Sequence, residues 1–172
     1  MERSDLEAQL ERHHEACYGW ALTCCRWDRS EAEDVLNSSY LKVIDGRASY
    51  GSRSTFKTWL FGVIRRTAAE HRRRSLLHRL WSGGSLDNIP ETADPAPDAA
   101  SMLRSAESSE RLVAALGMLP PRQREVLHLV FYQDLTIAEA AQVLGVSVGT
   151  ARTHYERGKT RLRSTLKPED DE

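Results

Sequence analysis

The hydrophobic residues of the first 27 positions recur at alternating intervals of four and three, which collects them on one face of an α-helix. The residues in this series are Leu6, Leu10, His13, Cys17, Trp20, Cys24 and Trp27. Mostly charged and polar residues lie between them, so the opposite face of the helix is suited to water. The pattern predicts one amphipathic helix from about Asp5 to Trp27.

Two more helical patterns follow before residue 80. Ser30 is a suitable N-cap for a helix with Glu31 and Glu33 in its first turn. The hydrophobic positions of that helix are Val35, Leu36, Tyr40, Leu41 and Ile44. The polar stretch 46–54 predicts a loop, and a third helix begins near Thr55 and continues into the arginines at 72–74. Its hydrophobic positions are Phe56, Trp59, Leu60, Val63, Ile64 and Ala68.

The composition of the chain changes beyond Leu80. Residues 81–100 contain three prolines, two adjacent glycines, four acidic residues and no basic residue, which predicts a flexible acidic linker. Helical spacing resumes near Met102 and continues through Leu119, and no segment shows the alternation expected of a strand. We therefore predict an all-α protein of two small helical domains, residues 5–80 and 102–167, joined by a linker at 81–101.

A helix-turn-helix pattern lies within the C-terminal domain. Thr136 and Glu139 have the spacing of a capping box and predict a helix that runs through Leu144. Gly145 occupies the position where a left-handed C-terminal cap favours glycine, and Ser147 can cap the next helix. One face of that next helix carries its hydrophobic or small residues, which are Ala151, Tyr155, Gly158 and Leu162.

The other faces of this second helix are polar and mostly cationic, which suits a helix that enters the major groove of DNA. The residues predicted to read bases are Arg152, Thr153, His154 and Arg157. Lys159 and Arg161 are predicted to contact phosphates. An ordinary corner between two helices shows a similar pattern, but two details favour DNA binding. Small residues at 149–151 allow close packing on the preceding helix, and Pro121 begins a third helix that supports the motif.

The similar numbers of acidic and basic residues, 25 and 24, conceal a strong asymmetry along the chain. Residues 1–34 contain nine acidic and four basic residues. In contrast, residues 57–79 contain seven Lys or Arg and one acidic residue. Residues 152–167 contain six Lys or Arg and one acidic residue. Two basic segments and one acidic segment predict two contacts with nucleic acid and one with a separate cationic partner.

The chain has the features of a cytoplasmic protein. Its longest hydrophobic run, 59–64, is too short to cross a bilayer, and its acidic N-terminus is unlike a secretory signal. Three cysteines, two of them adjacent, suit a reducing compartment. A zinc site is conceivable for the cluster His13, His14, Cys17, Cys24 and Cys25. Because three of these residues lie on the hydrophobic stripe, we expect them to pack in the core and expect no metal or other cofactor.

Two stretches of the C-terminal half carry a more specific signature, LPPRQREVL and LTIAEAAQVLGVSVGTARTHYERGKTRLR. They resemble the promoter-binding region 4 of sigma factors, and in particular the extracytoplasmic-function (ECF) group. The resemblance implies that this half reads the −35 promoter element. LuxR-type response regulators share a similar helical corner, but they carry an α/β receiver or a ligand-binding domain upstream, and this chain shows neither pattern.

The N-terminal half carries a second signature, EAEDVLN at 31–37 followed by YLKV at 40–43. It resembles the acidic motif of sigma region 2, whose helix binds a coiled coil on the largest subunit of RNA polymerase. The resemblance implies polymerase contacts by Glu31, Glu33, Asp34, Asn37 and Ser38. An acidic first turn also occurs on ordinary surface helices, because the helix dipole favours carboxylates there.

The segment FKTWLFGVIRR at 56–66 resembles the next element of sigma region 2, which melts the −10 promoter element and captures a flipped base. Melting requires cations for the separated backbone and a pocket or aromatic surface for an unstacked base. The implied −10 contacts are Lys57, Arg65, Arg66, Glu70 and Arg73. Trp59 is expected in the core, whereas Tyr50 and Phe56 are candidates for an exposed aromatic surface.

The chain departs from the family pattern at positions that concern both partners. Asn37 and Ser38 stand where the family usually has Gln and Glu, so one carboxylate of the polymerase contact is missing. A phosphate on Ser38 would restore that negative charge. Arg66 and Glu70 replace the usual asparagine and aspartate of the −10 segment, and His154 replaces an arginine of the recognition helix.

The two signatures together cover nearly the whole chain and predict an ECF-type sigma factor, a dissociable specificity subunit and not an enzyme. The predicted partners are the core of bacterial RNA polymerase, promoter DNA and an anti-sigma factor. Two alternatives remain open. One is a stand-alone helix-turn-helix regulator that binds duplex DNA without polymerase. The other is a polymerase-binding protein that has lost promoter melting.

Overall fold

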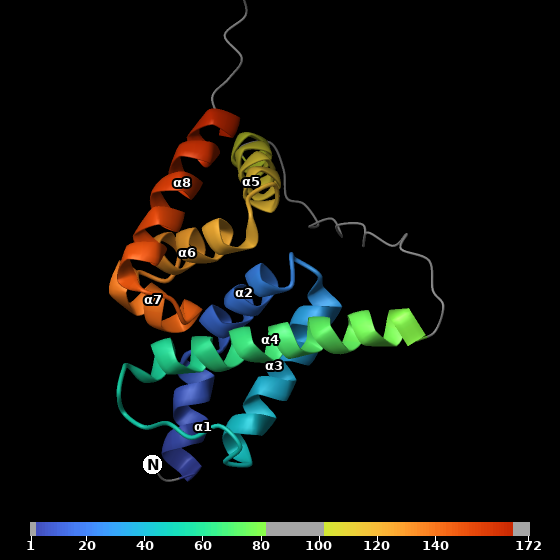
Figure 1. The fold of residues 1–172 in the computed structure, drawn as a ribbon, viewed down its shortest axis with the longest axis vertical. Helices are drawn as coiled ribbons and strands as arrows, with labels where there is room; N and C mark the ends of the chain where they lie inside the picture. Colours follow the sequence, from blue (N-terminus) through green and yellow to red (C-terminus); the bar gives the residue numbers. More distant parts are fainter. Residues whose placement is uncertain (1–2, 82–101, 167–172) are drawn as a thin grey trace, which may run out of the picture.

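The computed structural model describes residues 3–81 and 102–166, and all regular elements in these two stretches are helices (Figure 1). The N-terminal stretch holds α1 (Arg3–Arg12), α2 (His14–Cys24), α3 (Arg29–Ile44) and α4 (Phe56–Trp81). The C-terminal stretch holds α5 (Met102–Gly117), α6 (Pro121–Phe131), α7 (Ile137–Leu144) and α8 (Val148–Leu166). The predicted all-α fold is confirmed. The predicted linker at 81–101 lies, except for its first residue, outside the described residues.

The predicted single helix over 5–27 is wrong in two respects. A break at His13, with φ −102° and ψ 5°, separates α1 from α2, and α2 ends at Cys24. The break removes no residue from the hydrophobic series, and the Cys17 amide still donates to the His13 carbonyl at 2.8 Å. Periodicity therefore could not reveal an interruption of one residue.

The cap predicted at Ser30 is also wrong. The N-cap of α3 is Asp28, whose Oδ1 accepts a hydrogen bond from the Glu31 amide at 2.9 Å. Aspartate and serine cap helices about equally well, so the sequence offered two competing positions. Just before this cap, Arg26 and Trp27 both have positive φ, 55° and 64°, a conformation that is unfavourable for residues other than glycine.

The core of the N-terminal half lies between α2, α3 and α4. Trp20 is fully buried, and its Nε1 donates to the Phe61 carbonyl at 3.0 Å, which satisfies the one polar atom of the indole. Cys17 and Cys24 are buried in this core, as predicted, and Cys25 is buried beside them. Burial raises the pKa of Cys17 and of Cys25 to about 12.

The capping signals of the helix-turn-helix are confirmed. Thr136 Oγ1 accepts from the Glu139 amide at 3.2 Å, and Glu139 Oε2 accepts from the Thr136 amide at 2.9 Å, which completes the capping box. The Thr136 amide and the Thr136 hydroxyl both donate to the Glu139 carboxylate, and these two hydrogen bonds lower the pKa of Glu139. Gly145 closes α7 at φ 65°, and Ser147 Oγ accepts from the Thr150 amide at 3.1 Å where α8 begins.

The two halves of the chain pack against each other, which no sequence pattern indicated. α7 lies along α4, and α6 contacts α2 (Figure 1). Buried hydrophobic residues of both halves belong to one cluster, with Trp20 and Phe61 from the first half and Val126, Leu129 and Leu144 from the second. The contacts of α2, the 25–28 turn and α4 with α5, α6 and α7 form the interdomain interface.

His128 of α6 lies in the interdomain interface, against residues of α2. Its Nδ1 lies 2.9 Å from Thr23 Oγ1, and its Nε2 lies 3.2 Å from Gln133 Nε2. Its ring lies 5.5 Å from that of Trp20. Burial, together with the positive charge of Lys57, lowers the pKa of His128 to about 4. The imidazole is therefore neutral in the folded protein near neutral pH.

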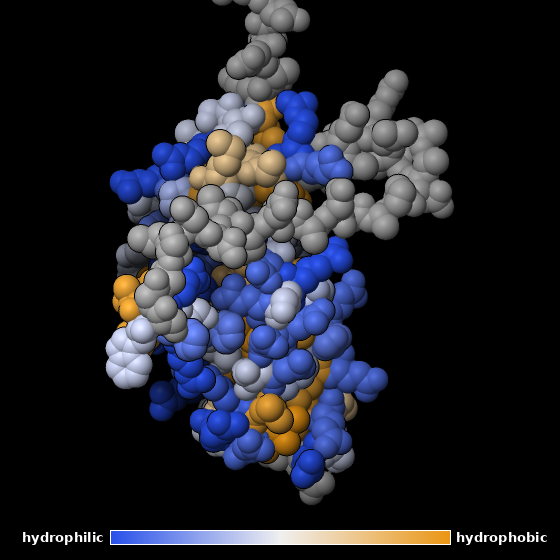
Figure 2. Space-filling model, turned by 90° about the vertical axis from the view of Figure 1, so that its right-hand side faces the viewer, coloured by the Kyte–Doolittle hydropathy of each residue, from blue (hydrophilic) through white to orange (hydrophobic). Residues whose placement is uncertain are grey.

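The C-terminal part of α4 extends beyond the packed body of the N-terminal half (Figure 1). Its exposed hydrophobic residues are Leu76, Leu77, Leu80 and Trp81. Seen from the side toward which this end points, the surface is mainly hydrophilic, with hydrophobic residues in small separate patches (Figure 2). None of the described helices combines the length and the hydrophobicity needed to span a membrane.

The low pKa of His128 predicts that acid weakens the fold. The unfolded chain protonates this ring below pH 6.5, whereas the folded chain does so only near pH 4. The free energy of unfolding should therefore fall as the pH is lowered from 6.5 to 4, by up to about 3 kcal/mol. Urea unfolding followed by circular dichroism measures this loss. His128→Gln cannot titrate and should lose less over the same interval. Parallel curves for the two proteins would contradict the prediction.

Candidate nucleic-acid and polymerase-binding surfaces

Most of the residues predicted to contact DNA are exposed on the polar side of α8. The exposed ones are Arg152, Thr153, Arg157 and Arg161, and the half-buried ones are His154 and Lys159. Thr153 Oγ1 donates to the Gly149 carbonyl at 3.0 Å, so its oxygen keeps lone pairs that can accept from a base. The first turns of α8 thus present a cation and a hydroxyl acceptor together.

The opposite side of α8 rests on α6. Ala151 and Gly158 are buried, and Tyr155 and Leu162 are partly buried, which confirms the predicted apolar stripe. α8 comes close to α6 at Gly158. A β-carbon there would lie 3.1 Å from Gln123 Cβ and 3.3 Å from the Gln123 carbonyl oxygen. A residue without a side chain is what allows α8 to pack this closely on α6.

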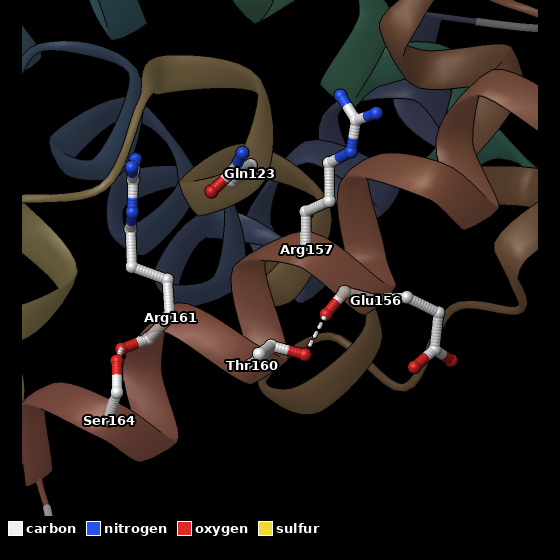
Figure 3. A pocket seen from close by; sticks show the side chains of 6 residues that line it. All are labelled: Gln123, Glu156, Arg157, Thr160, Arg161 and Ser164. Atoms are coloured by element: carbon white, nitrogen blue, oxygen red, sulfur yellow. Dashed lines mark hydrogen bonds between the residues drawn. The ribbon is translucent and has the colours of Figure 1, made fainter.

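An open pocket of about 510 Å³ lies where α8 passes the first turn of α6. Its lining residues are Gln123, Glu156, Arg157, Thr160, Arg161 and Ser164. Arg157 and Arg161 are one helical turn apart and extend on the side of α8 that faces Gln123, whereas the Glu156 carboxylate points away (Figure 3). Two guanidinium groups on one side of a pocket are suited to an anion such as a phosphate.

Lys159 is held by residues of its own helix. Its Nζ lies 4.9 Å from the centre of the Tyr155 ring and 3.4 Å from Glu156 Oε2. Phe131 of α6 stacks on Tyr155 with a centroid distance of 5.8 Å. To contact a phosphate, Lys159 would give up its ion pair with the exposed Glu156. It could keep its contact with the Tyr155 ring.

Two of the predicted −10 contacts are occupied by the C-terminal half. Lys57 Nζ donates to the Gln133 carbonyl at 2.9 Å. Arg65 Nε donates to Glu125 Oε2 at 3.1 Å, and Arg65 Nη1 donates to the Leu144 carbonyl at 3.3 Å. The side chains of Arg65 and Glu125 are 17% and 5% exposed, so the ion pair is largely shielded from water. In this arrangement the C-terminal half shields Arg65, whereas Lys57 is half-buried and has a hydrogen bond to Gln133.

Two other predicted −10 residues, Arg66 and Glu70, line a pocket of about 310 Å³ between α3, α4 and the 46–54 loop. Glu70 Oε2 accepts from Lys42 Nζ at 2.6 Å, and this hydrogen bond lowers the pKa of Glu70. Lys42 also donates to Thr67 Oγ1 at 3.0 Å, so one lysine orients two residues of the pocket. Arg73 is exposed and is not among the residues that line it.

Lys42 is a residue of this site that the sequence patterns missed. It lies in the YLKV stretch of the signature that resembles the polymerase-binding motif, and no DNA contact was predicted for it. Its partner Glu70 is 28 residues away on another helix, so no local spacing pointed to the pair. Only the packing of α3 on α4 brings the two side chains together.

Three aromatic residues cluster at the start of α4. The ring centroids of Tyr50, Phe56 and Trp59 lie 5.3 to 5.4 Å apart. Phe56 is only 9% exposed, so its prediction as an exposed aromatic surface is wrong, because its ring is covered by Tyr50, Trp59 and His13. Trp59, expected in the core, is half-buried in this cluster. Tyr50 is also half-buried and donates to the Ser54 carbonyl at 2.6 Å.

The residues predicted to contact polymerase differ in their surroundings on α3. Glu33, Asp34 and Asn37 are exposed, and Ser38 is half-buried. The Oε1 of Glu31 lies 3.4 Å from His71 Nδ1 of α4, so this carboxylate also has a partner within the N-terminal half.

α3 adds hydrophobic residues to this surface. Leu41 and Ile44, two of the hydrophobic positions of this helix, are 54% and 40% exposed. The intervals between Asp34, Asn37, Leu41 and Ile44 are three, four and three residues. The four side chains therefore share one face of the helix. This face is acidic near the start of α3 and hydrophobic near its end, and the combination suits a protein partner better than nucleic acid.

Comparisons with known proteins identify both halves. The family model for Sigma-70 region 2 matches residues 10–76, and the model for Sigma-70, region 4 matches residues 109–162. The RNA polymerase sigma factor YlaC of Bacillus subtilis is 25% identical over 135 residues, which are 78% of this chain and 77% of that protein. The ECF RNA polymerase sigma factor SigC of Mycobacterium tuberculosis is 28% identical over 154 residues, 88% of this chain and 78% of that protein.

A solved structure has a similar fold. It is the sigma factor RpoE, crystallised with the anti-sigma factor NepR from Bartonella quintana. The TM-score is 0.74 at 23% sequence identity, and the match covers 96% of this chain and 98% of that chain. The chain belongs to the sigma-70 family. Within that family its relatives identify it as an ECF-type alternative sigma factor for transcription initiation, as the two sequence signatures predicted.

The seating of α8 at Gly158 can be tested by filling the contact. Gly158→Leu should lower the free energy of unfolding by about 1–3 kcal/mol, because the new side chain meets the Gln123 backbone. Gly19→Ala is the control, since a β-carbon at Gly19 meets nothing within 4 Å. That variant should be neutral or more stable by up to about 1 kcal/mol. Urea unfolding measures both, and an unchanged midpoint for Gly158→Leu would refute close packing at this position.

Proposed function

We propose that this protein binds core RNA polymerase through its N-terminal half and contacts a promoter at two places, the −10 element with α4 and the −35 element with α8. One observation carries the proposal. α8 is capped by Ser147, packed on α6 through Gly158, and exposes Arg152 and Thr153 at its first turns. The proposed functional units are residues 5–80 and 102–167. The protein acts in the cytoplasm, where polymerase and DNA meet.

Within α8 we assign base reading to Arg152, Thr153 and His154, because the first turns of a recognition helix contact base edges in the major groove. Arg157 was expected to read bases as well. Its position beside Arg161 in one pocket is better suited to a backbone phosphate. Lys159 is assigned a phosphate contact of its own, because it does not line the pocket of Arg157 and Arg161.

The −10 element is assigned to α4 and the pocket beside it. The pocket of about 310 Å³ is large enough for an unstacked base, and it offers both hydrogen-bond donors and the acceptor Glu70. Lys42 is assigned the role of orienting Glu70. Lys57, Arg65, Arg66 and Arg73 supply positive charge along α4 for the separated strand.

The outer face of α3 is assigned to polymerase. Asp34 and Asn37 offer acceptors for cations or amides of the partner, and Leu41 and Ile44 can bury hydrophobic area against it. Glu33 adds a second exposed carboxylate. A further proposed partner is an anti-sigma factor, by analogy with NepR, with which RpoE was crystallised.

Transcription with purified core polymerase on a promoter library tests the function as a whole. The wild-type chain should direct initiation at a defined set of promoters. Asp34→Lys should reduce this activity about tenfold or more by weakening core binding, a loss of at least roughly 1.4 kcal/mol. Glu7→Lys makes the same charge change at another exposed carboxylate and should retain activity. Duplex binding without any initiation by the wild type would instead support the stand-alone regulator.

The assignment of Arg152 to base reading makes a separate prediction. Arg152→Ala should weaken binding to the preferred −35 duplex by about 1–3 kcal/mol and flatten the preference among base substitutions. Arg161→Ala should weaken binding to all duplexes alike and reduce its salt dependence. Fluorescence anisotropy with matched duplexes measures both. Equal losses on preferred and random DNA for Arg152→Ala would show that this residue contacts only phosphate.

A further inference from the structure

Exposed hydrophobic side chains gather at the C-terminal end of α4, which projects from the packed body of the N-terminal half (Figure 1). The last buried residue of this helix is Ala68, although the helix continues to Trp81. Four hydrophobic residues near its end belong to neither of the described core clusters. They are Leu76, Leu77, Leu80 and Trp81, with exposed fractions of 54%, 61%, 70% and 95%. The core of the protein therefore does not account for these four residues, which we call the α4 stripe.

The α4 stripe has arginines along both edges. Successive residues of an α-helix are about 100° apart, so the four side chains span an arc of about 140°. Arg74 lies just beyond the Trp81 edge of this arc, and Arg79 lies beyond the Leu76 edge. Both arginines are exposed, and no acidic residue follows Glu70 in α4. The stripe is hydrophobic in its centre and positively charged at its margins.

A second copy of the chain and a nucleic acid are both poor occupants of the α4 stripe. Two copies that packed stripe to stripe would bring like charges together, which is unfavourable. A nucleic acid would satisfy the arginines with its phosphates. Its charged backbone would offer no hydrophobic surface to the three leucines, however, so the centre of the stripe would gain nothing.

A folded protein is also a poor occupant, because the stripe is small and projects outward. A stable protein interface buries about 800 Å² on each partner. Three leucines and one tryptophan offer roughly 500 Å² when fully buried. The partner would in addition have to supply a groove that accepts a projecting helix.

A lipid bilayer needs neither the larger area nor the groove. Amphipathic helices lie in the bilayer interface with Leu and Trp at the acyl chains and Lys or Arg at the headgroups. Tryptophan is enriched at this depth, and each arginine near an anionic surface strengthens the binding. Arginines at the edge of a stripe keep their guanidinium groups in water while their stems cover hydrophobic surface. The α4 stripe has each of these features.

We propose that the C-terminal end of α4 binds peripherally to a membrane surface rich in anionic phospholipid. The stripe enters the interface, and Arg74 and Arg79 contact lipid phosphates. Because the stripe is less than two helical turns long, the binding is reversible and weakens as salt is added. This activity goes beyond the proposed function, since it requires neither DNA nor polymerase.

Cosedimentation of the full-length chain with vesicles tests the proposal. The chain should sediment with vesicles that contain phosphatidylglycerol and remain in solution with vesicles of phosphatidylcholine alone. Leu80→Ser combined with Trp81→Ser should weaken binding to the anionic vesicles about tenfold, because hydrophobic area is lost while every charge is kept. The control combines Val113→Ser with Met118→Ser, which removes two exposed hydrophobic side chains from the C-terminal half. It should bind like the wild type.

Tryptophan fluorescence locates the contact without relying on a polar substitution. Trp81 is 95% exposed, whereas Trp20 is buried and Trp27 and Trp59 are half-buried. Anionic vesicles should therefore shift the emission of the wild type to shorter wavelengths through Trp81. Trp81→Phe keeps a hydrophobic ring, so it should still sediment with the vesicles but lose the shift.

Three results would overturn the proposal. The first is a wild-type chain that stays in solution with anionic vesicles at low salt. The second is an unchanged shift in Trp81→Phe, or unchanged sedimentation of the double serine variant, because lipid would then contact another surface. The third is a double serine variant that binds vesicles like the wild type but loses transcription with core polymerase, which would make the stripe a protein contact. Retained transcription together with weakened vesicle binding is the expected result.

Discussion

The ion pair between Arg65 and Glu125 connects the two halves of this sigma factor at the point where α4 meets α6 and α7. Both side chains are largely buried, and Arg65 also binds the C-terminal carbonyl of α7 at Leu144. Glu125 keeps Arg122 of its own helix at 3.5 Å, but a state in which Arg65 loses Glu125 while still buried is disfavoured, because the Arg65 charge would be left without compensation. Separation of the halves in water avoids that penalty, since both charges are then hydrated. The pair therefore tolerates an open form and a closed form but not a partly open one.

The geometry of the DNA-binding helix depends on short-range features that are independent of this interface. The capping box at Thr136 and Glu139, the left-handed Gly145 and the Ser147 cap fix where α7 ends and where α8 begins. Gly158 then sets the depth at which α8 lies on α6. Because these features belong to the C-terminal half alone, the recognition surface can remain intact whether or not the halves are in contact.

The features predicted correctly from the sequence are those that residues close together in the chain determine. The helix-turn-helix was readable because its caps and its apolar stripe lie within 27 residues of one another, from Thr136 to Leu162. Asp28 and Ser30 were equally plausible caps for α3, and a one-residue break at His13 leaves no mark on the periodicity. The Lys42–Glu70 and Arg65–Glu125 pairs join residues far apart in sequence, so no local pattern predicted that these side chains bind each other.

The three sulfur atoms in the core of the N-terminal half bear on how this protein can be regulated. Only the thiolate form of cysteine reacts readily with oxidants and alkylating agents. Burial raises the pKa of Cys17 and Cys25 to about 12 and raises that of Cys24 as well, so all three are thiols at neutral pH. Peroxide in the cell should therefore leave these side chains unchanged while the helices remain folded. A redox signal that acts through cysteine oxidation would have to be sensed by another protein and passed on by binding.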